Sequence, residues 1–315
     1  MNREKFLFII NPISGGLDKS KYLNKLRQIF HSQQKTFEVF ETQGVEEDYA
    51  NALKAIDEFQ PDVVVAVGGD GTCNFVADLI TDKNVLFGIV PLGSANGLAR
   101  ELNISENHEL STKLLFSGIE KPIDALLING EHLCLHLSDI GLNAKVVKRF
   151  EEEKIRGKFG YLRQFIREII HTVPKKFRFE LNGNKFKKKA HMVVIANATK
   201  YGTGAVMNPV GKIDDGKFEI CIVKPFPKYA IFSIAYHMFM GSLKTSPYVK
   251  IISCKEITIH NPQEEVLQVD GEVIGYPPTV NVSIKKHAYR LIVPKPNARN
   301  SILGLPFSQT QSESH

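Results

Sequence analysis

A chain of 315 residues is longer than most single domains, so one large or two moderate domains are expected. The hydrophobic fraction of 43% and the charged fraction of 23% are those of an ordinary globular protein, which excludes intrinsic disorder. The net charge of +6 favours an anionic partner, such as a nucleotide, a nucleic acid or an acidic membrane surface, without choosing among them.

The chain shows no sign of a secreted or membrane-spanning protein. Its four cysteines lie far apart with no Cys/His ligand spacing, which predicts neither a disulfide framework nor a zinc site and fits a reducing cytoplasm. The first apolar run is too short for a secretory signal, and the longest, at 229–243, is shorter than a bilayer requires. We therefore expect a cytoplasmic protein that can still touch a membrane.

The N-terminal segment alternates apolar runs with amphipathic helical patterns. Runs that are apolar on both faces and separated by helices predict a parallel, doubly wound sheet. The expected strands are 6–12, 37–42, 63–69 and 85–93. One expected helix spans 45–59, and three others begin at Asp18, at Thr72 and near Ala95.

Small or polar residues follow each of these strands. They are NPISGG at 11–16, ET at 41–42, GGDGT at 68–72 and PLGSAN at 91–96. Ligands of doubly wound sheets bind beyond the carboxyl ends of the strands. Four such segments at one edge predict a binding site there.

The GGDGT segment has the composition of a phosphate-binding loop. Gly68, Gly69 and Gly71 can take positive φ and let backbone amides approach an anion. Thr72 adds a hydroxyl at the start of a helix, and Asp70 suits a divalent cation that bridges to phosphates. The alternative is an ordinary strand-to-helix turn, because Gly and Asp are common in turns.

The two flanking loops offer similar groups. In the first loop, Asn11 and Ser14 offer side-chain hydrogen bonds and Gly15 a backbone amide, although an ordinary connection is an equal alternative. In the later loop, Gly93 permits close backbone approach, and Ser94 is a helix N-cap or a ligand donor. The same loop also offers Asn96 as an orienting amide, and it is followed by Arg100, which is either a ligand cation or part of a solvated helix face.

After Pro122 the pattern becomes that of an antiparallel β-rich domain. Strand-like runs joined by polar turns, including Asn182-Gly183-Asn184, are typical of hairpins. Helical segments are expected at about 143–172 and 228–243, and the polar end at 306–315 is expected to be frayed.

Two acidic turns in this part are candidate sites. VDGE places Asp270 and Glu272 around a glycine, and the nucleotide loops lack a base that could accept a proton from an alcohol. KIDDG places Asp214 and Asp215 where they could hold a hard cation with backbone carbonyls. For both, a tight turn is the competing interpretation.

Basic residues are concentrated in two places, at 145–171 and at 185–189. Anionic lipid or nucleic acid could use them, with solvated surfaces as the alternative. No nucleic-acid motif accompanies them, so nucleic acid is not an expected partner.

These motifs, in this order, resemble the diacylglycerol kinase catalytic-domain family, which includes bacterial soluble lipid kinases and sphingosine kinases. GGDGT is shared with NAD kinases, whereas PLGSAN followed by LAREL and the late DGE favour lipid kinases. The resemblance implies an NAD-kinase-like α/β domain over 1–124, a β-sandwich lipid domain over 125–289, and a segment at about 290–305 that returns to the first domain.

The resemblance also implies roles for individual residues. Glu272 would be the proton acceptor beside Asp270, Asp70 would belong to the catalytic magnesium network, and a structural magnesium would be held by Asp215 with backbone oxygens near Lys212 and Lys217. ATP would be held by Asn11, Pro12, Ser14, Gly15, Thr42, Gly68, Gly69, Gly71, Thr72, Cys73, Asn74, Gly93, Ser94 and Asn96. Bacterial members usually have aspartate where this chain has Gly97.

The expected function is therefore an ATP- and Mg²⁺-dependent lipid kinase of phospholipid metabolism. Its partners would be ATP and a lipid substrate at an anionic membrane surface, with peripheral membrane association and a homodimer as one assembly. The alternatives are a sphingoid long-chain-base kinase, an NAD kinase, and a non-catalytic, nucleotide-gated membrane-binding module.

Overall fold

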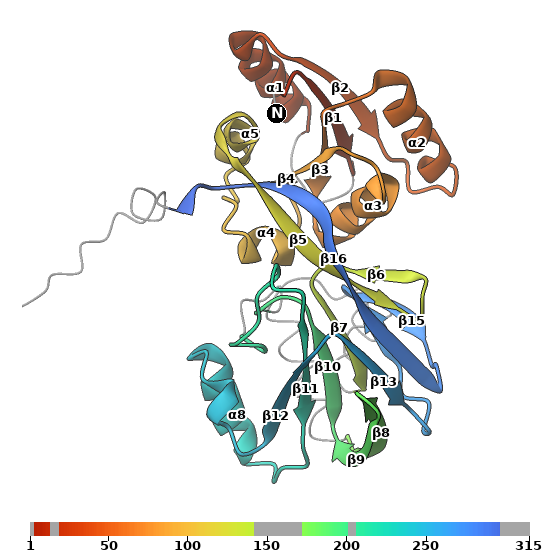
Figure 1. The fold of residues 1–315 in the computed structure, drawn as a ribbon. Helices are drawn as coiled ribbons and strands as arrows, with labels where there is room; N and C mark the ends of the chain where they lie inside the picture. Colours follow the sequence, from red (N-terminus) through yellow and green to blue (C-terminus); the bar gives the residue numbers. More distant parts are fainter. Residues whose placement is uncertain (1–2, 13–18, 142–171, 201–205, 297–315) are drawn as a thin grey trace, which may run out of the picture.

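The computed structural model describes residues 3–12, 19–141, 172–200 and 206–296. Figure 1 shows an N-terminal α/β part and a C-terminal β-rich part, joined by a long pair of strands. The predicted fold class, a doubly wound α/β domain followed by an antiparallel sandwich, is confirmed. The long helix expected at 143–172 falls almost wholly outside the described residues.

The N-terminal sheet is parallel, as the sequence predicts. Its strands have the order β2-β1-β3-β4, and every neighbouring pair runs in the same direction. Strands β1, β3 and β4 are almost entirely buried because apolar side chains on both faces are covered by helices. The strands are β1 Lys5–Ile10, β2 Thr36–Glu41, β3 Val63–Gly68 and β4 Leu86–Pro91.

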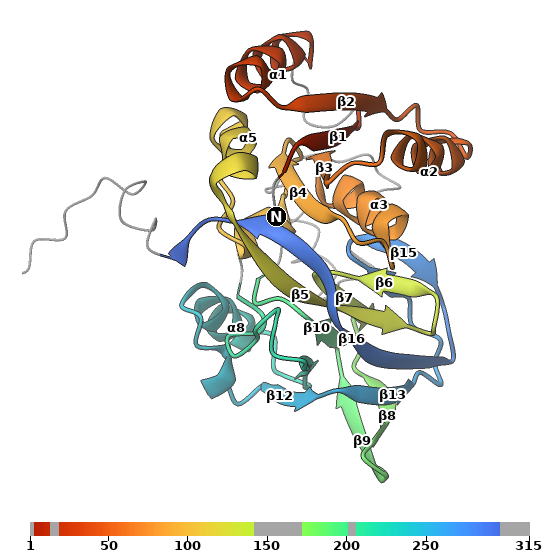
Figure 2. The same cartoon turned by 45° about the horizontal axis from the view of Figure 1, so that its top comes forward.

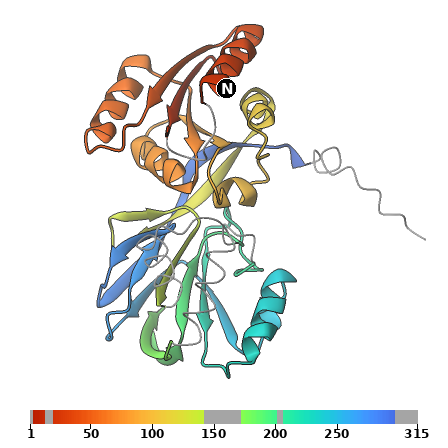
Figure 3. The same ribbon diagram turned by 180° about the vertical axis from the view of Figure 1, so that it is seen from behind.

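Helices cover both faces of this sheet (Figures 1 and 3). Helices α1 and α5 share one core with β1, β3 and β4, and α2, α3 and α4 share another on the opposite face. Their bounds are α1 Lys19–Gln33, α2 Asp48–Phe59, α3 Asp70–Ile80, α4 Gly97–Glu101 and α5 His108–Ser117. Three helix starts differ from the prediction by two or three residues, because α2 begins at Asp48 rather than 45, α3 at Asp70 rather than Thr72 and α4 at Gly97 rather than near Ala95. The start expected at Asp18 lies outside the described residues.

The antiparallel pair of β5 (Ile119–Ile128) and β16 (Thr279–Val293) links the two parts. Near its end, β16 also pairs with β4 of the N-terminal sheet through Leu291 and Phe87. The pair is interrupted by a bulge between Lys285 and Tyr289, where buried Asp124 accepts hydrogen bonds from the backbone N–H of His287 (2.8 Å) and of Gly216 (2.7 Å). One carboxylate thus fixes the crossing between the two parts.

The C-terminal part is a sandwich of two sheets around an apolar core. One sheet continues from β16 and the other has the order β12-β11-β10-β7-β14-β15. The strands are β6 His132–Cys134, β7 Leu137–Gly141, β8 Lys175–Leu181, β9 Asn184–Ala190, β10 Met192–Ala196, β11 Phe218–Val223, β12 Val249–Cys254, β13 Glu256–His260, β14 Leu267–Val269 and β15 Glu272–Gly275. The predicted hairpin turn is present, with positive φ at Asn182 and Gly183.

The helical segment expected at 228–243 is present as α8 (Ala230–Phe239), followed by a 3-10 turn at Leu243–Thr245. It packs on the outer face of the second sheet (Figure 1). Among the described residues, no helix is long and apolar enough to cross a membrane.

Candidate active site

The β14–β15 turn brings the C-terminal part to the start of α3. Asp270 and Gly271 both have positive φ, so the chain reverses in two residues and Glu272 begins β15. The Glu272 Oε1 atom lies 3.8 Å from the position that a Cβ on Gly71 would occupy. Figure 2 shows β15 and β6 alongside α3. The GGDGT loop and the DGE motif therefore belong to one site.

The glycines of this site permit contact between two loops. A Cβ on Gly68 would overlap the Thr72 side chain, and a Cβ on Gly93 would overlap the Cα of Gly69. None of Gly68, Gly69 and Gly71 has positive φ, so that prediction was wrong. The absence of a Cβ on Gly69 and Gly93 lets the loops after β3 and β4 touch through their backbones. The sequence predicts close backbone approach at Gly93, but not that Gly69 is the partner.

The PLGSAN loop is closed by Asn96. Its side chain accepts a hydrogen bond from the Gly93 N–H (2.8 Å) and donates one to the Gly93 carbonyl (2.9 Å). Asn96 has φ 52° and stands at the N-cap of α4, so Ser94 is not the cap; Ser94 is exposed beside the loop. Thr72 is likewise not at a helix start but buried in the first turn of α3.

Asp70 connects the two loops. Its carboxylate accepts hydrogen bonds from the backbone N–H of Gly97 (2.9 Å) and of Leu98 (3.1 Å), the first residues of α4. A carboxylate has about four acceptor positions, so two remain for a further ligand. Asp70 thus stabilises the site through its own contacts, and the metal ligation expected of it stays a prediction.

The remaining predicted nucleotide residues are distributed along the same edge of the sheet. Asn11 donates its N–H to the Val67 carbonyl (3.3 Å), and Thr42 donates its N–H to the Ile10 carbonyl (2.9 Å), so both follow adjacent strands. Pro12 is exposed, whereas Cys73 is buried and Asn74 is half-buried in α3. Ser14 and Gly15 lie outside the described residues.

Asp270 holds the β14–β15 turn in place. Its carboxylate accepts hydrogen bonds from the backbone N–H of Leu135 (2.7 Å), His136 (3.0 Å) and Leu137 (2.9 Å), and from the Cys134 thiol (3.4 Å). Burial raises the pKa of Asp270, and the backbone donors partly offset this effect. Its contacts identify Asp270 as a residue that positions the turn, and the catalytic role expected of it stays a prediction.

We expect Asp270→Asn to lower the free energy of unfolding by about 2–4 kcal/mol, because hydrogen bonds to a buried charged group contribute about 1.5–3 kcal/mol each. An amide also points an N–H group at backbone donors. Urea denaturation of both proteins measures the difference. A midpoint and slope equal to those of the wild type would contradict the anchoring role.

Glu272 differs from Asp270 in that no described residue donates a hydrogen bond to its carboxylate, and its side chain is accessible to solvent. Partial burial between the two parts raises the pKa of Glu272, and the negative charges of Asp270 and Asp78 raise it further. Asp78, on the second turn of α3 after Asp70, was missed by the sequence analysis. A carboxylate in the last turn of a helix carries no local signal, and only the approach of β15 gives Asp78 a role.

The DDG segment forms an exposed turn before β11. The Asp215 carboxylate accepts a hydrogen bond from the Lys217 N–H (3.0 Å), and Asp214 forms an ion pair with Lys121 (3.1 Å). Lys212 lies on the same turn, so the three expected structural-metal residues are adjacent. In the described ranges, no group of three or more His, Cys, Asp or Glu side chains is gathered to hold a metal, so such a site would depend on backbone oxygens.

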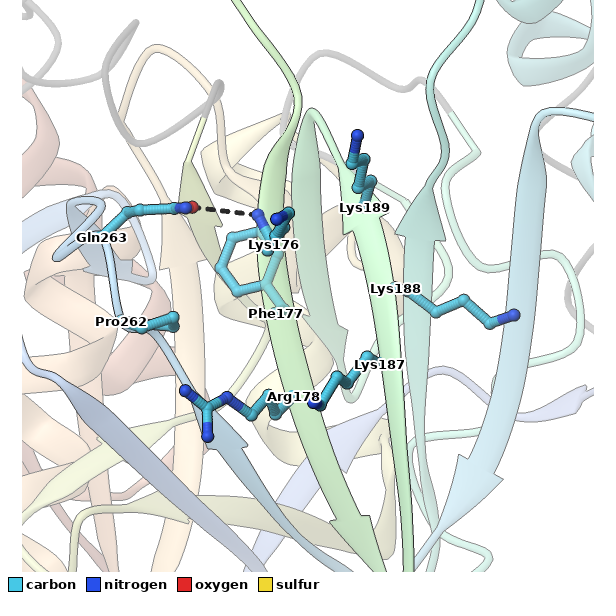
Figure 4. Close-up of a pocket in the computed structure, with 8 residues that line it drawn as sticks. All are labelled: Lys176, Phe177, Arg178, Lys187, Lys188, Lys189, Pro262 and Gln263. Atoms are coloured by element: carbon cyan, nitrogen blue, oxygen red, sulfur yellow. Dashed lines mark hydrogen bonds between the residues drawn. The ribbon is translucent and has the colours of Figure 1, made fainter.

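A single arginine, Arg100, and the basic cluster at 185–189 lie outside the site. Arg100 pairs with Glu106 (2.6 Å), which agrees with its interpretation as part of a helix surface. The cluster at 185–189 lies on the β8–β9 hairpin, whose basic side chains line a surface pocket (Figure 4). There Lys189 stands opposite Lys176 and Lys187 opposite Arg178. Figure 1 places this hairpin at the far end of the C-terminal part from α3.

Two family descriptions match this chain. Residues 5–128 match the diacylglycerol kinase catalytic domain, and residues 138–293 match the YegS C-terminal NAD kinase beta sandwich-like domain. The boundary between them falls beside β6 and β7, and the two matches together cover most of the chain. They meet in space along the β5–β16 pair and where β15 reaches α3.

Curated relatives align over nearly their whole length. A diacylglycerol kinase of Bacillus subtilis (strain 168) is 23% identical over 305 residues, covering 95% of this chain and 98% of the relative. A diacylglycerol kinase of Staphylococcus aureus (strain bovine RF122 / ET3-1) is 24% identical over 292 residues, covering 90% and 91%.

A solved structure shows the same fold. The crystal structure of a diacylglycerol kinase from Bacillus anthracis str. Sterne superposes with a TM-score of 0.74 at 20% identity, covering 94% of this chain and 98% of that chain. At 20% identity, the similarity shows a shared fold of the two parts, in agreement with the strand order described above.

Proposed function

Because the chain belongs to the diacylglycerol kinase catalytic-domain family, we propose that it transfers the γ-phosphoryl group of ATP to a lipid hydroxyl, with diacylglycerol as the first candidate acceptor. The observation that carries the proposal is the position of Glu272 beside Gly71 at the start of α3. An anion-binding helix end and a carboxylate with a raised pKa meet there.

The start of α3 offers the groups that a triphosphate requires. The first N–H groups of a helix have no intrahelical acceptor, and the helix dipole makes this end favourable for anions. Helix α3 begins at Asp70, directly after Gly69, and the loop after β4 lies against it. The phosphates would lie along this loop, with Asn11 and Thr42 at the neighbouring strand ends.

Glu272 would act as the general base. The lipid hydroxyl oxygen forms the new bond to the γ-phosphorus, the bond from that phosphorus to the bridging oxygen of ADP breaks, and the hydroxyl proton passes to Glu272. Phosphoryl transfer depends mainly on positioning and charge neutralisation, so a modest base suffices. The raised pKa of Glu272 brings this carboxylate closer to the range in which a base works best near neutral pH.

The chain has residues that fit magnesium. Asp70 keeps acceptor positions beside the two that the α4 amides use, and Asp215 with the carbonyls of Lys212 and Lys217 could hold a second, structural ion. Magnesium bound at Asp70 would neutralise the charge of the phosphates.

The proposal is tested by incubating the full chain with ATP labelled in the γ-phosphate, magnesium and a total lipid extract, followed by chromatography of the lipids. We expect label in one lipid class, and addition of pure diacylglycerol should increase it. Label in a sphingoid base would redirect the acceptor assignment. Label only in NAD would overturn the lipid kinase proposal.

The pKa of Glu272 makes a separate prediction about pH. A base acts only when deprotonated, so kcat/KM should rise with pH through the pKa of Glu272. Since the negative charge of Asp78 raises that pKa, Asp78→Asn should lower it and move the acid limb of the profile to lower pH. An unmoved acid limb would show that the limb reports a group other than Glu272.

A further inference from the structure

Helix α8 presents a row of large apolar side chains to solvent. Phe232 is 79% exposed and Phe239 is 72% exposed, and Tyr229, Tyr236 and Met240 are also exposed. These five residues, here called the aromatic face, recur at helical spacing and therefore lie on one side of the helix. Contiguous apolar surface of this kind marks an interaction site in soluble proteins.

The opposite side of α8 is fixed in the core. Ala230 and Ile234 are buried, and Ile234 belongs to an apolar cluster with Leu243 and Val249. The backbone N–H of Val206 also donates to the carbonyl of Met238 (3.1 Å). Rotating the helix to bury the aromatic face would expose this cluster, so the face stays outward.

The chain segment that carries the aromatic face has charges of one sign. Residues 220–255 contain no aspartate or glutamate but five lysines, namely Lys224, Lys228, Lys244, Lys250 and Lys255. Lys228 precedes the helix and Lys244 follows it, and both are exposed. In a symmetric dimer the same patch faces itself, so a second copy would bring lysines against lysines. An anionic lipid surface complements both the charge and the aromatic side chains, because Tyr and other aromatic residues favour the membrane interface.

We propose that the aromatic face of α8 inserts into the interface of an anionic bilayer and holds the protein at the membrane in which its acceptor lipid lies. The anchor adds a membrane-binding surface to the proposed kinase. It depends on the proposed function only for the reason why the protein would bind a membrane. Vesicle binding can be measured without ATP or turnover, so the anchor and the kinase can fail separately.

The test compares the wild type with the double variant Phe232→Ser/Phe239→Ser by cosedimentation with phosphatidylcholine vesicles and with vesicles that also contain phosphatidylglycerol. The expected result is binding to the anionic vesicles that the double variant weakens by at least about tenfold, since each aromatic side chain removes substantial apolar area from water. Lys228→Gln/Lys244→Gln should weaken only binding to anionic vesicles, by about fivefold or more.

Leu110→Ser is the matched control, because Leu110 is an exposed apolar residue on α5 of the other part. It should bind vesicles as the wild type does, and equal thermal unfolding of all variants checks the fold. Wild-type binding by the Phe232→Ser/Phe239→Ser protein would overturn the anchor. So would a wild-type dimer in lipid-free solution that this variant converts to a monomer, because a second copy would then cover the face. If Phe232→Ser/Phe239→Ser binds vesicles less tightly than the wild type, and the wild type labels no lipid, the anchor proposal would be supported and the kinase proposal contradicted.

Discussion

Replacement of Glu272 by glutamine is expected to lower kcat for lipid phosphorylation by about 10²–10⁴-fold, the range that a general base contributes. Glutamine keeps the shape of the side chain but cannot accept the hydroxyl proton. The fold should be unaffected, because the Glu272 side chain is accessible and its neighbour Asp270 makes the hydrogen bonds that hold the turn.

The matched control is Glu256→Gln, which removes an exposed carboxylate from β13 in the same part of the molecule. It should leave kcat within about twofold of the wild type, because surface substitutions away from functional groups have small effects. Equal ATP affinity in Glu272→Gln and the wild type would assign the loss to the transfer step. Undiminished turnover in Glu272→Gln would remove this residue from the base role.

The second large effect is expected at Gly93. In Gly93→Ala the new Cβ would overlap the Gly69 Cα and stand 2.8 Å from Asn96 Oδ1, so the loops after β3 and β4 must separate. Overpacking of this kind costs about 1–3 kcal/mol, and the displaced loop should also weaken ATP binding. Thermal unfolding measures the first effect and nucleotide titration the second.

Gly71→Ala provides the contrast for Gly93→Ala. A Cβ at Gly71 would meet nothing nearer than Glu272 Oε1 at 3.8 Å, and alanine favours the helical state over glycine by about 1 kcal/mol. The Gly71 variant should therefore unfold at or above the wild-type temperature. Equal destabilisation by the two substitutions would contradict the loop contact as the reason for Gly93.

The sequence was most informative where the local pattern is sufficient. Apolar runs followed by small or polar residues predict β1, β3 and β4, and the Asn182-Gly183 pair predicts the β8–β9 turn, because both depend on neighbouring residues alone. Helix α5 was not predicted. Its hydrophobic pattern is weak, and its packing beside α1 is a tertiary contact.

Residue roles that depend on contacts between distant segments could not be predicted. The sequence assigns Gly68 and Gly69 to phosphate contact through positive φ, whereas in the structure Gly68 makes room for the Thr72 side chain and Gly69 for the backbone of Gly93. It assigns Asp70 to a cation alone, and the carboxylate also caps α4. Asp270 lies next to the expected base in the sequence, yet its bonds go to residues 134–137.

These contacts change how a substitution of Asp70 is interpreted. Asp70→Asn would remove charge from a carboxylate that accepts two backbone hydrogen bonds, so lost activity in that variant does not by itself identify a metal ligand. The N–H of Gly97 is one of those donors, so the position where the family resemblance led us to expect aspartate takes part in the same contact through its backbone. Glu272 is the more informative position.

A crystal structure with magnesium and a non-hydrolysable ATP analogue tests most directly whether the start of α3 and Glu272 serve one reaction. We predict the triphosphate along Gly69–Asn74, with the γ-phosphorus and the Glu272 carboxylate facing the same space. A triphosphate bound elsewhere, or a γ-phosphate shielded from Glu272 by protein, would contradict this account.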